Sequence, residues 1–370
     1  MKKKLLLIAP SQKQRNKRDF SLLHPAPGML AQAGTKMLSV PPLNLAMVAA
    51  HTPKGWDVEI LDERVQDIDF SQDADLVAIT AFTPSAPRAY YISKQFRDRG
   101  VPTVMGGIHA SVLPDEAQQH FDSVVVGEAE GLWQRVINDF EHRELRSRYL
   151  HETDTYPDLV DLPPPRRELF NFKEYTTINT VQISRGCPHN CDFCSAREVF
   201  GNQYRHRPID DVIDEIVKMA DFQQPPTENL IDRIVKRALN KYKFMIILDD
   251  NISGNKPYAK ELFRRLIPLG ITWAGQASRT IGYDEELLDL AAESGCQTVF
   301  IGFESISDGT LGEMGKVWGK RQDKLQEHED LIKRIHDRGI GINGAFILGY
   351  DGDTADVFER TVEFVEKKPS

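Results

Sequence analysis

The chain has 370 residues, of which 41% are hydrophobic and 27% charged, with a formal net charge of -9 and a pI near 5.6. This length allows two domains, and the acidic balance disfavours nucleic acid as a partner because phosphate binding needs a basic surface. No apolar run approaches the ~18 residues of a membrane span, and "MKKKLLLIAP" is too short for a secretory signal. We therefore expect a cytoplasmic protein without a transmembrane segment.

The first part of the chain, residues 1–140, alternates apolar runs with helical patterns. Strands are expected at 3–10, 57–63, 75–83, 101–107 and 123–128. These runs are continuously apolar, as in a parallel sheet that is covered on both faces. Helices are expected between them at 41–52, 86–100 and 114–121. The rhythm predicts an α/β fold, a doubly wound Rossmann-like domain whose ligands lie at the carboxyl ends of its strands.

A charged segment with the stiff phrase "LPPPRR" follows, and residues 141–175 are expected to be an interdomain linker. A second β/α series then occupies residues 176–370. Its strands are expected at 178–184, 244–248, 271–276, 298–303 and 341–348, and its helices at 208–220, 256–270, 284–295 and 326–339. Five such units predict a partial (β/α) barrel.

Two features of the second series depart from a regular barrel. Residues 220–241 look like an insertion between its first helix and its second strand. The amphipathic pattern at 354–370 has no strand after it, so we expect a chain that is shortened at its C-terminus and lacks the last barrel strand.

Three of the four cysteines, Cys187, Cys191 and Cys194, form C-x-x-x-C-x-x-C in "SRGCPHNCDFCS". Neighbours this close are poor disulfide partners, whereas thiolates are soft ligands for zinc, copper(I) or iron–sulfur clusters. A structural zinc needs four ligands, and here only His189, cramped between two of the cysteines, or the distant Cys296 could be the fourth. A [4Fe–4S] cube with three cysteines keeps one iron open for another ligand.

This triplet, with the aromatic Phe193 before its last cysteine, resembles that of the radical S-adenosylmethionine (radical SAM) superfamily. The resemblance covers about 178–370. It implies a [4Fe–4S] cluster on the three cysteines, with S-adenosylmethionine on the open iron and its adenine near the backbone of Phe193. It also implies release of a 5′-deoxyadenosyl radical, with electrons from an external donor such as flavodoxin or ferredoxin.

Polar side chains at three later strand ends are candidates for binding S-adenosylmethionine. They are Asp249, Asp250, Asn251, Gln276, Ser278 and Glu304. By the resemblance, "LDDN" lies near the methionyl ammonium, for which its carboxylate and amide oxygens are acceptors. "QAS" would meet the ribose or the substrate, and the glutamate of "GFES" would accept hydrogen bonds from the ribose. A helix cap and an ordinary polar strand end are the alternative interpretations of the first two motifs.

In the first domain, "APSQKQRNKRD" follows the first strand, so the G-x-G-x-x-G dinucleotide fingerprint is missing. Small residues cluster instead in "TAFTPS", "GGIHAS" and "GEAEG", where a flat ligand can approach the backbone unless the glycines only make a tight turn. These loops resemble the cobalamin-binding domain of many radical SAM enzymes. By that resemblance the cobalamin pocket is lined by Thr83, Gly106, Gly107, His109, Gly127 and Glu128.

The motif D-x-H-x-x-G, which supplies a lower-face histidine to cobalt in other cobalamin domains, does not occur in the sequence. A hydrogen bond from His109 to the corrin side chains or tail is therefore expected rather than ligation of cobalt.

The combined resemblance is to cobalamin-dependent radical SAM enzymes, and most to the branch that contains hopanoid methylases. It implies methyl transfer from methylcobalamin to an unactivated carbon of a small-molecule or lipid substrate. Two alternatives stay open. One is a cobalamin-dependent cyclase or oxidase without methyl transfer, and the other is a non-catalytic cobalamin and redox sensing module. A zinc-containing nucleic-acid protein is disfavoured by the acidic charge and the cysteine triplet.

Overall fold

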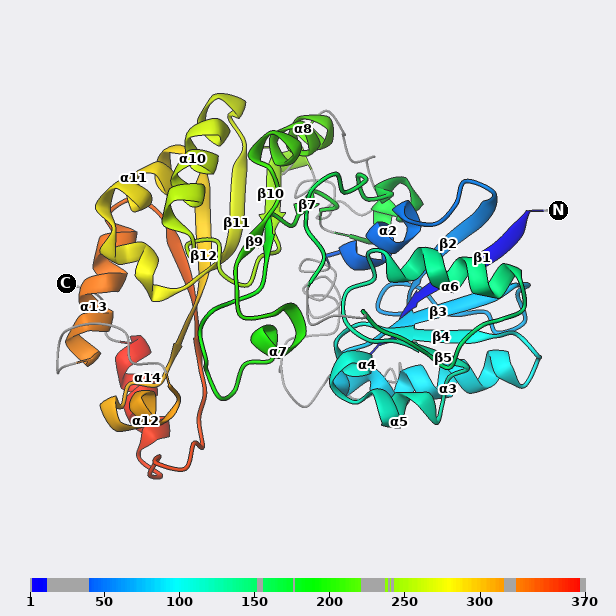
Figure 1. The fold of residues 1–370 in the computed structure, drawn as a ribbon. Coiled ribbons are helices and arrows are strands. Elements are labelled where there is room, and N and C mark those ends of the chain that lie inside the picture. Colours follow the sequence, from blue (N-terminus) through cyan, green and yellow to red (C-terminus); the bar gives the residue numbers. More distant parts are fainter. Residues whose placement is uncertain are drawn as a thin grey trace. The chain divides into compact units, whose positions relative to one another are not determined.

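The computed structural model describes residues 2–11, 40–151, 156–175, 177–220, 237–238, 240, 243–315 and 324–366. The chain divides between Thr180 and Val181 into two compact units, whose elements are labelled in Figure 1. The insertion expected at 220–241 lies almost entirely outside the described residues. Among the residues described, no helix has the length and apolar character needed to cross a membrane.

A six-stranded parallel sheet forms the centre of the N-terminal unit, in the order β2-β1-β3-β4-β5-β6. The strands are β1 (Lys3–Ala9), β2 (Trp56–Asp62), β3 (Leu76–Thr80), β4 (Thr103–Gly106), β5 (Ser123–Val125) and β6 (Arg148–Tyr149). The five expected strands are confirmed. The strand order reverses between β1 and β3, which makes the carboxyl ends of these strands the topological switch point where such sheets bind ligands.

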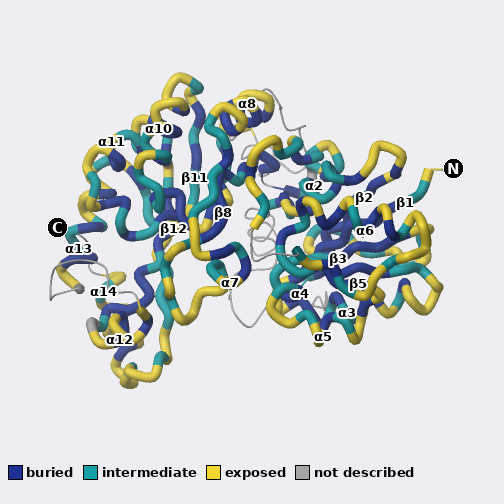
Figure 2. Tube along the Cα trace, viewed as in Figure 1, coloured by how far each residue is buried: buried dark blue, intermediate teal, exposed yellow. Residues whose placement is uncertain are grey.

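Helices cover both faces of this sheet (Figure 1). One face carries α2 (Leu43–Ala50) and α6 (Leu132–Glu141), and the other carries α3 (Ala86–Arg97), α4 (Ile108–Val112) and α5 (Pro114–Gln118). Alternate residues of β1 enter different cores, Leu5 and Leu7 on one side and Leu6 and Ile8 on the other. Two-sided burial therefore explains why β1 is continuously apolar, and Figure 2 shows the strands of this sheet mostly in the buried colour.

The described residues of the segment 141–175, which the sequence suggests as a linker, belong to the N-terminal unit. It supplies β6, and its aromatic residues Phe170 and Tyr175 are buried in the core with α2 and α6. The hydroxyl of Tyr175 donates to Asp62 Oδ2 at 3.0 Å. The prolines and charged residues of this segment suggested an exposed linker, whereas its aromatic residues Phe170 and Tyr175 attach it to the core.

The second unit contains a five-stranded parallel sheet in the order β13-β12-β11-β10-β7. The strands are β7 (Thr180–Val181), β10 (Phe244–Ile247), β11 (Thr272–Ala277), β12 (Cys296–Glu304) and β13 (Gly341–Phe346). Spatial neighbours follow the order of the chain, as in a barrel that stays open. The strand expected at 178–184 is divided, because its second part becomes β8 (Ser184–Arg185), which pairs antiparallel with β9 (Arg205–His206).

The helices in the described part of this unit are α7 (Ala196–Phe200), α8 (Ile209–Ala220), α10 (Lys256–Leu266), α11 (Glu285–Glu293), α12 (Asp308–Glu313), α13 (Lys324–His336) and α14 (Val357–Glu366). The apolar stripes of α8, α10, α11 and α13 pack on the outer face of the sheet. They meet strand residues such as Trp273, whose ring stacks on Phe263 with centroids 5.2 Å apart. Side chains cap two of them, since Asn255 and Asp284 each accept a hydrogen bond from a backbone amide of the first turn.

Candidate cluster and cofactor sites

The cysteine loop lies between β8 and α7. It begins at Gly186, which has a φ of +87° and leaves no room for a side chain, because a Cβ would lie 2.1 Å from the carbonyl oxygen of Gln203. The amide of Cys187 donates to the carbonyl of Gly201 at 3.0 Å, which attaches the loop to the end of α7. Cys187 and Cys191 are partly exposed and Cys194 is exposed. The three thiols therefore lie on a single loop whose backbone is fixed at its start by the Gly186 turn and the Cys187–Gly201 hydrogen bond.

This donor set fits a [4Fe–4S] cube with one open iron, because a cube takes a single thiolate per iron. Burial, with the nearby charges of Cys194 and Asp250 adding to it, raises the pKa of the Cys187 thiol. Among the described residues, no three His, Cys, Asp or Glu side chains are arranged so that they could bind a single metal ion.

Asp249, at the end of β10, is buried and faces the segment that leads to the cysteine loop. Its Oδ1 accepts a hydrogen bond from the amide of Ile183 at 2.7 Å, and its Oδ2 accepts one from the hydroxyl of Ser184. Burial raises the pKa of Asp249 to about 7. Both oxygens thus accept hydrogen bonds from the first residue of β8 and the residue before it, and a contact of Asp249 with S-adenosylmethionine stays a prediction.

Asn251 and Ser278, expected from two different motifs, are in contact. Asn251 Oδ1 accepts hydrogen bonds from the amide of Ser278 at 2.9 Å and from the hydroxyl of Ser253 at 2.8 Å. Its Nδ2 donates to the hydroxyl of Tyr204 at 2.8 Å. Hydrogen bonds through Asn251 thus connect the segments that follow β10 and β11. The sequence did not indicate Tyr204, because it lies 47 positions before Asn251 and meets it only in the folded chain.

Asp250 and Phe193 are both exposed to solvent, Phe193 by 39%. The protein around Asp250 still desolvates its carboxyl group and raises its pKa. The contact between the backbone of Phe193 and an adenine, which the resemblance implies, stays a prediction.

Glu304 ends β12 in a strained conformation. It has a φ of +66°, and the register between β12 and β13 shifts between Gly302 and Glu304. A left-handed backbone costs a residue other than glycine about 1–3 kcal/mol and is found preferentially at functional sites. The side chain is buried, and its charge favours the charged form of Arg279.

Arg279, which sequence reasoning did not select, is a fully buried cation directly after Ser278. Burial lowers its pKa, while the charges of Tyr283, Glu327 and Glu304 act in the opposite direction. Its Nη1 lies 3.4 Å from Nδ1 of His328. The carboxyl ends of β11 and β12 therefore share a buried group of opposite charges.

The inner face of the open barrel carries an exposed aromatic side chain. Phe300 is 39% exposed, while Val299 and Ile301, on the outer face of β12, have no exposed surface. Phe300 is in register with Gln276 on β11 and with Asn343 on β13, and both amides are also exposed. Barrels normally fill this face with apolar side chains, so a row of amide, phenyl and amide groups is suited to a ligand.

The cobalamin candidates lie at the carboxyl ends of β3, β4 and β5. Gly107 has a φ of +88°, and a Cβ there would lie 2.4 Å from Thr80 Oγ1. A Cβ on Gly106 would meet nothing within 4 Å, and one on Gly127, whose φ is +87°, would have His151 at 3.9 Å as its nearest neighbour. The backbone at this edge is therefore bare, which fits the approach of a broad flat group such as a corrin.

His109 is buried beside this edge and both of its ring nitrogens have partners. Nε2 lies 2.6 Å from the hydroxyl of Tyr90, and Nδ1 lies 3.3 Å from the hydroxyl of Thr83. Tyr90 donates its proton to Glu116 Oε1 at 2.8 Å, so it accepts from His109 and the Nε2–H tautomer follows. Burial lowers the pKa of His109, which favours the neutral ring.

Thr83 is exposed and Glu128 is buried at the same edge. The carbonyl of Glu128 lies 3.0 Å from Nε2 of His151. Of the six residues expected to line the cobalamin pocket, Gly106 ends β4 and the other five follow β3, β4 or β5. Their contact with cobalamin stays a prediction.

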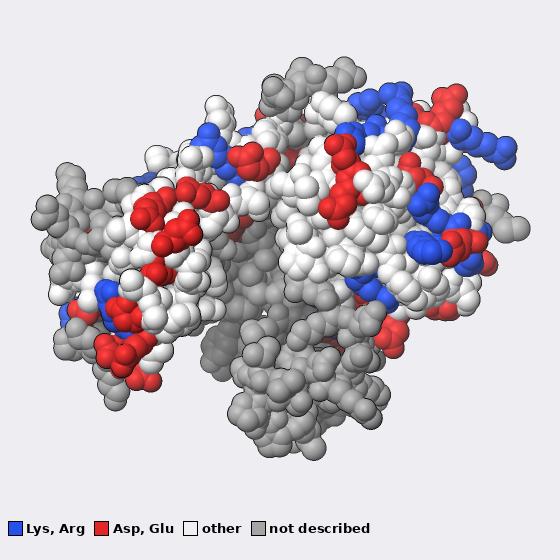
Figure 3. Space-filling view, turned by 90° about the horizontal axis from the view of Figure 1, so that it is seen from below, with Lys and Arg blue, Asp and Glu red and all other residues white. Residues whose placement is uncertain are grey.

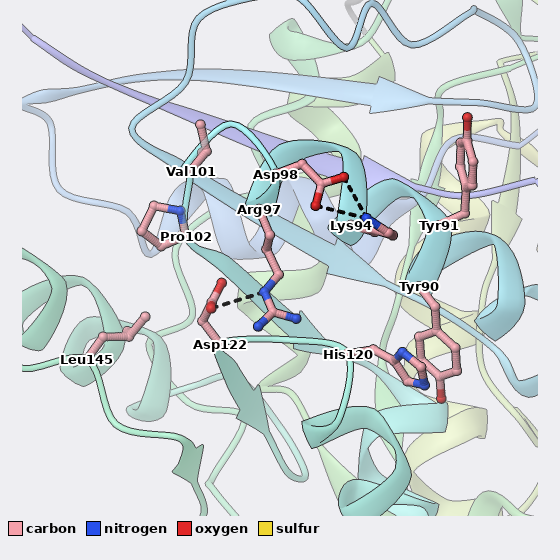
Figure 4. A pocket seen from close by; sticks show the side chains of 11 residues that line it. Tyr90, Tyr91, Lys94, Arg97, Asp98, Val101, Pro102, His120, Asp122 and Leu145 are labelled. Carbon is pink, nitrogen blue, oxygen red and sulfur yellow. Dashed lines mark hydrogen bonds and ion pairs between the residues drawn. The ribbon is translucent and has the colours of Figure 1, made fainter.

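A groove at the opposite edge of the same sheet does not coincide with these residues (Figure 4). It is lined by α3 and by the segments that lead into β4 and β5. Its cations are paired, Lys94 with Asp98 at 2.7 Å and Arg97 with Asp122 at 3.1 Å. On the face seen in Figure 3, acidic and basic side chains lie next to one another in several places, and some acidic side chains gather without a basic neighbour.

Comparisons with known proteins assign the two units. A family model described as the radical SAM superfamily matches residues 181–365. The chain belongs to the radical SAM superfamily. A second model, described as a B12 binding domain, matches residues 33–137. This radical SAM protein is therefore a cobalamin-binding member, whose cofactors are a [4Fe–4S] cluster, S-adenosylmethionine and cobalamin, and the α/β fold class expected from the sequence is confirmed.

Curated relatives of this radical SAM chain include methyltransferases. It is 32% identical to bacteriochlorophyllide d C-12(1)-methyltransferase of Chlorobaculum tepidum, over 97% of this chain and 76% of the relative. It is 26% identical to hopanoid C-2 methylase of Rhodopseudomonas palustris, over 89% of this chain and 60% of the relative. The expected relationship to hopanoid methylases is confirmed, and the chain is an enzyme.

Among solved structures, the radical SAM methyltransferase TsrM of Kitasatospora setae, bound to tryptophan and a SAM analogue, has a similar fold. The TM-score is 0.69 at 17% identity, over 98% of this chain and 70% of that chain. At this identity the similarity concerns the fold alone. It agrees with an N-terminal Rossmann-like unit followed by a partial barrel.

Proposed function

We propose that this enzyme transfers a methyl group to a carbon atom of a small-molecule or lipid substrate. The observation that carries the proposal is the alignment with the Chlorobaculum tepidum methyltransferase, which covers both the cobalamin-binding and the radical SAM unit. When bound, the cluster and S-adenosylmethionine supply a hydrogen-abstracting radical, and cobalamin supplies the methyl group.

We assign the residues of the second unit as follows. Cys187, Cys191 and Cys194 hold the cluster, since they share one loop that Gly186 allows to form. The polar groups at the ends of the neighbouring strands hold S-adenosylmethionine, with the adenine at the backbone of Phe193. They are Asp249, Asp250, Asn251, Gln276, Ser278 and Glu304.

We assign the substrate to the inner face of the barrel, over Phe300. The exposed phenyl ring gives an apolar surface, and the exposed amide of Asn343 beside it on β13 supplies hydrogen bonds. Gln276, on the other side of the ring, is assigned to S-adenosylmethionine. This combination suits a largely apolar molecule with a few polar atoms.

The proposal also includes an external electron donor of the flavodoxin or ferredoxin type and a cytoplasmic location. A cluster held by exposed thiolates needs a compartment in which cysteines stay reduced. Two-hybrid or cross-linking capture of a low-potential electron carrier, and cell fractionation, test these two parts.

The decisive experiment is anaerobic reconstitution of the full chain with iron, sulfide and cobalamin, followed by assay with methyl-labelled S-adenosylmethionine and candidate substrates. Methyl transfer is expected to give 5′-deoxyadenosine, S-adenosylhomocysteine and labelled product together. A cyclase or oxidase would give 5′-deoxyadenosine without labelled product, and a sensing module would give neither nucleoside.

A matched pair of cysteine variants tests the cluster. Cys191→Ala should lose iron, sulfide and all 5′-deoxyadenosine formation. Cys296→Ala should keep them, because Cys296 is buried in the core, where burial raises its pKa to about 12. Equal cluster content in both variants would contradict the assignment.

A further inference from the structure

A tyrosine hydroxyl lies beside the first cysteine of the loop. The Oη of Tyr204 is 3.9 Å from the Sγ of Cys187, and it is 2.8 Å from the Nδ2 of Asn251. Tyr204 directly precedes β9, which pairs with β8 immediately before the loop. The pairing of β8, before the cysteine loop, with β9, after it, thus places the Tyr204 hydroxyl next to the sulfur of Cys187.

The direction of these hydrogen bonds follows from the groups involved. An amide nitrogen only donates, so the Tyr204 oxygen accepts from Asn251 and keeps its own proton for another acceptor. A cysteine thiolate bound to iron carries no proton and can only accept. The order is therefore Asn251 to Tyr204 to Cys187.

The phenol is held in this position from two sides. Gly254 packs against the ring so closely that a Cβ there would lie 2.1 Å from Cζ and 2.2 Å from Oη of Tyr204. Asn251 cannot turn away, because the amide of Ser278 and the hydroxyl of Ser253 both donate to its Oδ1. A polar group fixed in this way needs no reorganisation when the charge on the neighbouring sulfur increases.

We propose that Tyr204 is a positioning residue that donates a hydrogen bond to the thiolate of Cys187 and thereby raises the reduction potential of the cluster. Hydrogen bonds to the sulfur atoms stabilise the reduced cluster, which carries one more negative charge. The inference rests on the proposed role of Cys187 as a cluster ligand.

The test is a redox titration, followed by electron paramagnetic resonance, of the full chain reconstituted with iron and sulfide and without S-adenosylmethionine. Tyr204→Phe removes only the hydroxyl. We expect the midpoint potential of this variant to be more negative than that of the wild type. At the wild-type midpoint potential, its ratio of reduced to oxidised cluster should be up to tenfold lower, and a tenfold change corresponds to a shift of about 59 mV for a one-electron couple.

Tyr258→Phe is the matched control. This tyrosine is also partly buried, but its hydroxyl donates to the backbone carbonyl of Arg207 at 2.9 Å. Its removal should leave the midpoint at the wild-type value. A Tyr204→Phe cluster with full iron content and an unchanged midpoint overturns the inference while the cluster assignment stands.

A second variant decides the matter if Tyr204→Phe holds no cluster. In Asn251→Asp the new carboxylate accepts the proton of Tyr204 and takes it away from Cys187. The backbone of His189 also hydrogen-bonds to Cys187, and its exchangeable deuteron stays in both proteins. In D₂O, ²H ENDOR of the reduced cluster should therefore show an additional coupling, from the phenol deuteron, in the wild type that is absent from this variant. Retention of that coupling overturns the inference, and a wild-type chain that binds no cluster overturns it together with the cluster assignment.

Discussion

The carboxylate of Asp249 accepts the backbone amide hydrogen of Ile183 at 2.7 Å, across 66 positions in the sequence. This contact takes the place of a strand-to-strand hydrogen bond where β7 gives way to β8. Asp249 is therefore the residue through which the end of β10 supports the approach to the cysteine loop.

Replacement of this carboxylate should destabilise the fold. Asp249→Ala leaves the buried amide of Ile183 without its acceptor, and we expect a loss of about 1–3 kcal/mol in the free energy of unfolding. Asp249→Asn is the matched variant, because its amide oxygen can still accept from Ile183. Urea denaturation of the full chain measures both, and equal losses in the two variants would contradict this role.

The same residue predicts a pH dependence. The pKa of Asp249 is raised by burial from 3.8 to about 7, so the folded protein keeps a proton that the unfolded chain releases. Its stabilising contribution is complete below pH 3.8 and is lost as the pH rises through about 7. Between these values the wild type should lose stability more steeply than Asp249→Asn. Parallel slopes in urea midpoints across this range would exclude the titration of Asp249.

Substitutions of the adjacent glycines Gly106 and Gly107 should affect different properties, cobalamin binding and stability respectively. Gly107→Ala places a side chain at a φ of +88° and 2.4 Å from Thr80 Oγ1, so we expect a loss of about 1–3 kcal/mol in stability. Gly106→Ala meets no protein atom within 4 Å and should fold normally. It should still bind cobalamin more weakly, because the methyl group occupies the bare edge. Thermal unfolding and cobalamin titration followed by absorbance check the pair.

His109 should not ligate cobalt, because hydrogen bonds engage both of its ring nitrogens in the buried core. The measurement is the electron paramagnetic resonance spectrum of the protein loaded with cob(II)alamin. Labelling the histidines of the protein with ¹⁵N is expected to leave the nitrogen splitting unchanged. A change of a triplet into a doublet on labelling would show ligation by a histidine.

The extent of the N-terminal unit can be tested with fragments. A chain that ends at residue 140 lacks β6, Phe170 and Tyr175, and it exposes the apolar surface that these residues cover. We expect it to aggregate or to unfold at lower urea concentration than a chain that ends at residue 180. Tyr175→Phe, which removes the hydrogen bond to Asp62, should cost the longer fragment about 0.5–1.5 kcal/mol.

Several elements were readable from sequence because their signals are local. The continuous apolar run of β1 reflects burial on two faces, and the amphipathic period of α11 follows from one buried stripe. The cysteine spacing belongs to a single loop, so it needs no tertiary contact to be recognised. The helix α6 escaped prediction although its Leu132, Trp133, Val136 and Ile137 show helical spacing.

The sequence by itself determined the α/β class, the two units, the cysteine triplet and the family, because hydrophobic periodicity and motif spacing are properties of neighbouring residues. Only the tertiary structure decided that Asp249 holds β8, that Asn251 meets Tyr204, that Arg279 is buried near Glu304 and that Phe300 faces the open barrel. Each of these features either is a contact between residues of different elements or depends on which face of a strand is covered. Such contacts arise only when the strands align their carboxyl ends, and no local pattern in the chain encodes them.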